Sequence, residues 1–74
     1  MMTKLAGLGN VLDRRNWEWL EESLPDVAAE IETAVEQGSE PSEIAAFMRA
    51  TIGDHRSALI TTCMSAARYL RRQR

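Results

Sequence analysis

Apolar residues in the first half of the chain recur every three or four positions. From residue 17 to residue 35 they are Trp17, Leu20, Leu24, Val27, Ala28, Ile31, Ala34 and Val35. This spacing is typical of an amphipathic α-helix that buries one face. Pro25 interrupts the stripe without shifting its phase, and a proline inside a helix costs about 3 kcal/mol. We therefore expect two helices, over residues 14–23 and 24–37, with Ser23 as the N-cap of the second and Gly38 ending it.

The same signals of helix start and stop recur nearer the C-terminus. A helix over residues 41–52 is expected after a capping Ser39, and it ends before Gly53. Its predicted apolar stripe consists of Ile44, Phe47, Met48 and Ile52. The last predicted helix, 54–72, begins with Asp54 as N-cap. Its broad apolar face, typical of the central helix of a bundle, comprises Leu59, Ile60, Cys63, Met64, Ala66, Ala67 and Leu70.

The first dozen residues show a weaker helical signal. Leu5, Leu8 and Leu12 keep helical spacing, whereas Gly7 and Gly9 each weaken a helix by about 1 kcal/mol relative to alanine. We expect a separate short helix over residues 3–12. No segment shows the alternating pattern of a strand, and the connections are short. The sequence therefore predicts one all-α domain, a compact bundle of four or five short helices.

Charge divides the chain into two unlike halves. Residues 1–40 carry nine acidic side chains against three basic ones, and residues 41–74 carry two acidic side chains against six arginines. One interpretation is that solvated helix faces simply differ in charge. The other is a pair of opposed patches that orient contacts between copies or with another protein.

The residue types that perform catalysis are sparse. His55 is the only histidine, and it lies beside Asp54 and near Ser57, too close in sequence for these groups to surround one substrate atom. Cys63 is the only cysteine, which excludes an intramolecular disulfide. We expect no enzyme activity, no catalytic residue, no cofactor, no metal and no small-molecule substrate. No apolar run is long enough to span a membrane and no signal peptide is evident, so we expect a cytoplasmic protein.

Two tryptophans lie two positions apart in the predicted helix 14–23. They point about 200° apart around a helix, so they face different surroundings. Trp17 shares a face with Leu20 and is the better core candidate. Trp19 lies on a polar side, where either the N-terminal segment covers it or it anchors a partner. The predicted partner-binding residues are Trp19, Glu18, Glu22, Asp26, Arg68, Arg71 and Arg72.

Small helical size, short loops and opposed charge patches resemble the death-fold class of adaptor domains in architecture. That resemblance implies assembly through complementary charged faces, as in a self-associating regulatory or signalling adaptor. An inhibitor that binds a host protein fits the same features. The alternative is a small DNA-binding transcriptional regulator, because residues 42–70 resemble a helix-turn-helix. The first helix of that stretch is about four residues longer than in the common form of the motif.

Overall fold

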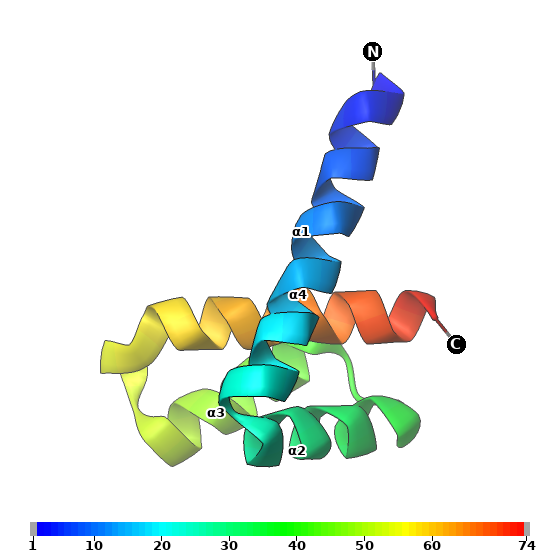
Figure 1. Cartoon of the computed structure of the whole chain (residues 1–74). Helices are drawn as coiled ribbons and strands as arrows, with labels where there is room; N and C mark the ends of the chain where they lie inside the picture. Colours follow the sequence, from blue (N-terminus) through cyan, green and yellow to red (C-terminus); the bar gives the residue numbers. More distant parts are fainter. Residues whose placement is uncertain (1, 74) are drawn as a thin grey trace.

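The computed structural model describes the backbone of residues 2–73 and the side chains of residues 9–73. It contains the helices α1 (Met2–Ser23), α2 (Pro25–Glu36), α3 (Pro41–Ile52) and α4 (Ser57–Arg72), with a short 3-10 turn, η1 (Asp54–Arg56), before α4 (Figure 1). No strand occurs among the described residues, so the all-α prediction is confirmed. None of these helices is both long and apolar enough to cross a membrane.

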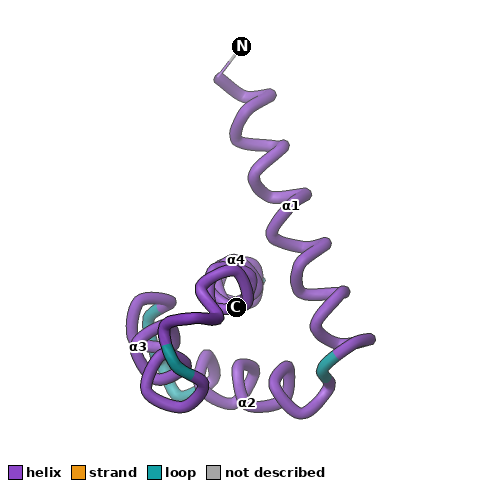
Figure 2. The backbone as a smooth tube through the Cα atoms, turned by 90° about the vertical axis from the view of Figure 1, so that its left-hand side faces the viewer, coloured by secondary structure: helices purple, strands orange, loops and turns teal. Residues whose placement is uncertain are grey.

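The first helix is longer than predicted. Residues 3–12 and 14–23 were expected to form two helices, and the structure joins them in the single helix α1. Glycine lowers helix stability without blocking helical dihedral angles, so Gly7 and Gly9 weaken this region and do not end it. The N-terminal end of α1 extends away from the other three helices (Figures 1 and 2).

The predicted break before Pro25 is confirmed. Leu24 leaves the helical region with φ −138° and ψ 66°, because a following proline disfavours the α conformation. The cap was predicted wrongly: Ser23 is the last residue of α1, and Leu24 takes the N-cap position without a side-chain hydrogen bond. At the other end of α2, Gly38 has φ +90°, a value that favours glycine and allows the chain to turn toward α3.

The starts of α3 and α4 also differ from the predicted caps. Glu40, and not Ser39, is the N-cap of α3, and its backbone amide donates a 2.7 Å hydrogen bond to Oε1 of Glu43. This capping-box arrangement of Glu40 and Glu43 gives a hydrogen-bond partner to the backbone amide of Glu40, which has none within the helix. Asp54 begins the 3-10 turn η1, so α4 itself starts three residues later, at Ser57.

Helix α4 lies at the centre of the bundle. It packs against α1, α2 and α3, and Figure 2 shows it nearly end-on between them. The core that surrounds it consists of Trp17, Leu20, Ala28, Ile31, Val35, Ile44, Ala45, Met48, Ile60, Cys63, Ala66, Ala67 and Leu70. This central position is the one that the broad apolar face of the last predicted helix indicated.

One predicted core position is wrong. Phe47 was placed on the buried stripe of α3, yet 58% of its surface is exposed. Helix α3 buries an arc formed by Ile44, Ala45 and Met48, and the ring of Phe47 lies at the outer edge of this arc. The exposed ring borders a groove that is described below.

Candidate functional site

The two tryptophans of α1 have the different surroundings that their spacing predicted. Trp17 packs in the core with 8% of its surface exposed, whereas 48% of Trp19 is exposed. One of the two alternatives for Trp19 is wrong, because the N-terminal segment does not fold back over it. Residues 2–23 form one helix, which carries the segment away from Trp19 (Figure 1).

The surface around Trp19 mixes apolar and charged side chains, including the exposed Arg15 one helical turn before it. Leu12 lies seven residues earlier, so it shares a side of α1 with Trp19, and 51% of its surface is exposed. The predicted acidic border, Glu18, Glu22 and Asp26, is exposed as well. We call Leu12, Trp19, Glu18 and Glu22 of α1 the Trp19 face; Asp26, the remaining residue of the predicted border, lies on α2 beyond the break at Leu24. The opposite side of α1 packs on the rest of the bundle and is anchored there.

That anchor is a buried carboxylate that the sequence analysis missed. Asp13 is only 7% exposed. Its side chain accepts a hydrogen bond from the hydroxyl of Ser65, and its two oxygens lie 3.4 Å from Nη2 of Arg68 and 2.8 Å from Nη2 of Arg72. Asn16 completes the cluster by donating a 2.9 Å hydrogen bond to the Ser65 hydroxyl. One sequence signal pointed there: Asp13 lies four residues before Trp17 and therefore continues the buried face of α1.

The cluster keeps Asp13 ionised. Burial by itself raises the pKa of this carboxyl, but the hydrogen bonds from Ser65, Arg72 and Arg68 outweigh burial and hold its pKa below the usual value. The ion pair joins the middle of α1 to the last turns of α4. Cys63, also in the core, shows the opposite effect, because burial raises the pKa of its thiol.

The structure places the three predicted partner-binding arginines beside acidic side chains of the same chain. Arg68 and Arg72 pair with Asp13, and Nη1 of Arg71 lies 2.7 Å from Oε2 of Glu40. A partner that bound these guanidinium groups would have to compete with the internal pairs. Within the described part of the chain, the ion pairs of these arginines are with Asp13 and Glu40, and not with the predicted acidic border Glu18, Glu22 and Asp26. Sequence reasoning did not foresee these intramolecular partners.

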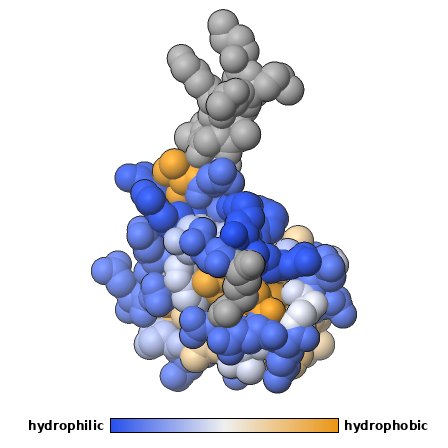
Figure 3. Space-filling view, turned by 90° about the vertical axis from the view of Figure 1, so that its right-hand side faces the viewer, coloured by the Kyte–Doolittle hydropathy of each residue, from blue (hydrophilic) through white to orange (hydrophobic). Residues whose placement is uncertain are grey.

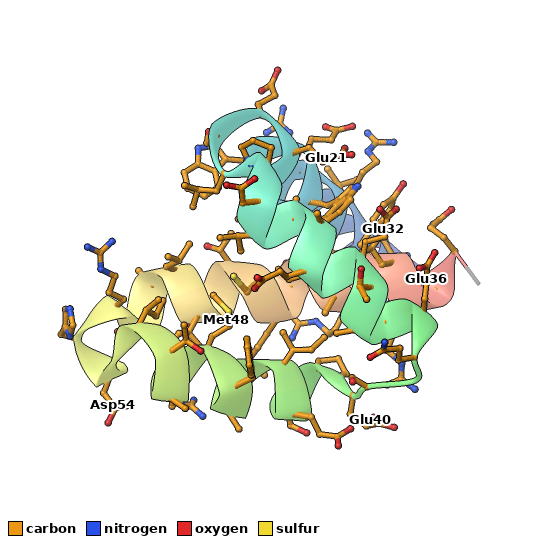
Figure 4. The ribbon with its side chains drawn as sticks, turned by 90° about the horizontal axis from the view of Figure 1, so that it is seen from below. Glu21, Glu32, Glu36, Glu40, Met48 and Asp54 are labelled. Atoms are coloured by element: carbon orange, nitrogen blue, oxygen red, sulfur yellow. The ribbon has the colours of Figure 1, made fainter. Side chains whose placement is uncertain are left out.

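A second surface feature lies between α2 and α3. Both helices pack on α4 more than on each other, which leaves a groove of about 470 Å³ between them. We call it the α2–α3 groove; its lining residues are Ala29, Glu30, Ile31, Thr33, Ala34, Gln37, Ser39, Glu43, Ile44, Phe47 and Met48. Figure 4 shows the two helices that form it, with Met48 between α3 and α4. The space-filling view, taken from the side of the molecule on which α4 ends, shows small hydrophobic patches within a largely hydrophilic face (Figure 3).

The stretch that resembles a helix-turn-helix folds as α3, η1 and α4. Its second helix, α4, is the central helix of the bundle, and it buries Ile60, Cys63 and Leu70 among other residues. The residues that would begin the recognition helix, His55, Arg56 and Ser57, are exposed, whereas the apolar face of α4 is turned into the core. In the described part of the chain no three His, Cys, Asp or Glu side chains gather in a way that could hold a metal ion.

Comparisons with known proteins add no further assignment. No family model matches the sequence, and neither curated proteins nor solved structures give a match.

Proposed function

We propose that this chain is a protein–protein interaction module and that the Trp19 face is its contact surface. The observation that supports the proposal is the exposure of Trp19 on a helix whose other side is firmly buried. Tryptophan is enriched among residues that dominate binding energies, because its large ring loses much apolar surface when a partner covers it. A regulatory adaptor and an inhibitor of another protein would both use such a surface.

The exposed part of Trp19 is large enough to matter for affinity. About half of a tryptophan surface corresponds to roughly 100 Å², and covering that area contributes about 2–3 kcal/mol. Leu12 extends the apolar surface along the same side of α1. These two residues form a plausible centre for a contact whose rim is polar.

The charge of the border indicates the kind of partner. Glu22 and Glu18, the latter 4.0 Å from Nε of Arg14, favour a protein that presents lysine or arginine around an apolar pocket. The arginines of α4 in another copy are one such source, but each already lies beside an acidic residue of its own chain. The proposal therefore assigns the basic groups to a partner of different sequence.

The experiment is a quantitative pull-down from extracts of the source cell, using tagged wild-type protein and variants. Trp19→Ala is expected to lose a protein that the wild type retains, because truncating an interface tryptophan commonly costs 2 kcal/mol or more of binding. Val11→Ala is the matched control, since Val11 is another exposed apolar residue of α1, lies about two turns before Trp19 and is not part of the Trp19 face. Thermal unfolding followed by circular dichroism verifies that both variants fold.

Equal retention by Trp19→Ala and the wild type would refute the proposal. A large fall in the melting temperature of Trp19→Ala, comparable with that of Trp17→Ala, would also refute it. In that case both indole rings would be structural.

A further inference from the structure

The α2–α3 groove has the dimensions and lining of a helix-binding site. The lining runs from Ala29 to Gln37 along α2 and from Glu43 to Met48 along α3, which corresponds to about 12 Å and about 8 Å of helix. About two turns of a partner helix would match this length. The small side chains of Ala29 and Ala34 form part of the lining and allow close approach, while Phe47 offers a large exposed ring at the edge. Grooves of this kind bind amphipathic helices through apolar residues spaced three and four positions apart.

The charge of the groove indicates which kind of partner helix it would bind. Glu30 and Glu43 are the only charged residues that line it, and both are acidic. They belong to a longer stretch, residues 16–48, that contains nine acidic residues and neither lysine nor arginine. Two copies that met through this groove would bring like charges together, which is unfavourable. A basic helix from another protein satisfies both the apolar lining and the acidic edge.

We propose that the α2–α3 groove binds a basic amphipathic helix of a partner protein. A large apolar side chain of this helix packs against Phe47, and its lysine or arginine residues pair with Glu30 and Glu43. This site lies on different helices from the Trp19 face and does not depend on it. The protein would therefore present two separate contact surfaces, as an adaptor requires.

The test uses a fluorescein-labelled helical peptide of about 14 residues that contains leucines at helical spacing and lysines elsewhere. Fluorescence polarisation measures its affinity for the full chain. Phe47→Ala is expected to weaken binding at least about tenfold, because the groove loses its largest apolar contact. Val11→Ala is the matched control, since it also truncates an exposed apolar residue and lies outside both the groove and the Trp19 face.

A second pair of variants tests the charge. Glu30→Lys is expected to weaken binding about tenfold at low salt and to reduce the salt dependence of the affinity. Glu32→Lys makes the same charge change on the side of α2 that is turned away from α3 (Figure 4), and it should bind within about twofold of the wild type. A peptide with glutamate in place of lysine should not bind measurably.

Three results would overturn the proposal. The first is the absence of binding to the Leu/Lys peptide by folded wild-type protein. The second is an equal loss of affinity in Glu30→Lys and Glu32→Lys, which would show general charge attraction instead of a groove. The third is self-association of the wild type, seen by sedimentation and abolished by Phe47→Ala, which would identify a second copy as the occupant. Trp19→Ala should leave peptide binding unchanged, so this test is independent of the Trp19 face.

Discussion

Replacing Asp13 by asparagine should reveal how strongly α1 depends on its buried ion pair. The change keeps the size of the side chain and an oxygen that can accept the hydrogen bond of Ser65, but it removes the charge that faces Arg68 and Arg72. Thermal and urea unfolding of the two proteins, followed by circular dichroism, measures the difference in free energy of unfolding.

The expected loss of free energy of unfolding depends on how exposed the two arginine partners of Asp13 are. Each arginine side chain is about half exposed, at 46% and 40%, so each pair is screened by solvent and contributes at most about 1 kcal/mol. The hydrogen bond from Ser65 to a charged acceptor is stronger than one to a neutral amide, by about 1 kcal/mol. We expect a total loss of about 2 kcal/mol, which lowers the melting temperature of a domain of this size by roughly 8–16 °C.

The effect of pH has a definite sign. The pKa of Asp13 is lower in the folded state than in the unfolded state, so its charge stabilises the fold above the unfolded pKa of about 3.9. This stabilisation is lost as the pH falls through the folded pKa. The wild type and Asp13→Asn should therefore differ most near neutral pH and converge in strong acid.

Glu32→Gln serves as the control, because it removes one acidic charge from an exposed position of α2. It should change stability by less than about 0.5 kcal/mol. If Asp13→Asn is equally harmless, or if its deficit persists unchanged in strong acid, the stabilising role of the cluster is refuted.

Two further predictions concern the core and nucleic acid. Leu20→Ala should cost about 2–5 kcal/mol in urea unfolding because Leu20 is fully buried, whereas Leu59→Ala, at a half-buried position, should cost only about 1–2 kcal/mol. Equal losses of free energy of unfolding would show that burial does not determine the relative cost of these two substitutions. In gel-shift assays with duplex DNA at physiological salt we expect only weak, sequence-independent binding, because the arginines of α4 lie beside acidic residues of the same chain. A tight, sequence-selective shift would instead support the DNA-binding regulator.

Local physics determined much of the fold. Helical periodicity located the helical segments, although it divided α1 into two, and proline and glycine marked most helix ends because these residues act on their own backbone wherever they occur. Pro25 ended α1, and Gly38 adopted the positive φ expected after α2. The opposite orientation of Trp17 and Trp19 followed from helical geometry alone. The caps were less predictable, because Ser23 and Ser39 compete with neighbouring residues for the same position.

The tertiary structure decided the features that depend on which helices meet. Asp13 and Ser65 are 52 residues apart, so no local rule could pair them. The same holds for the arginines of α4, whose acidic partners lie on α1 and at the start of α3. Phe47 looked like a core residue because it continues an apolar stripe, yet the arc of α3 that meets α4 excludes it. The α2–α3 groove arises because both helices pack on the same central helix. Local sequence signals do not indicate which helices pack together, so they could not predict this groove.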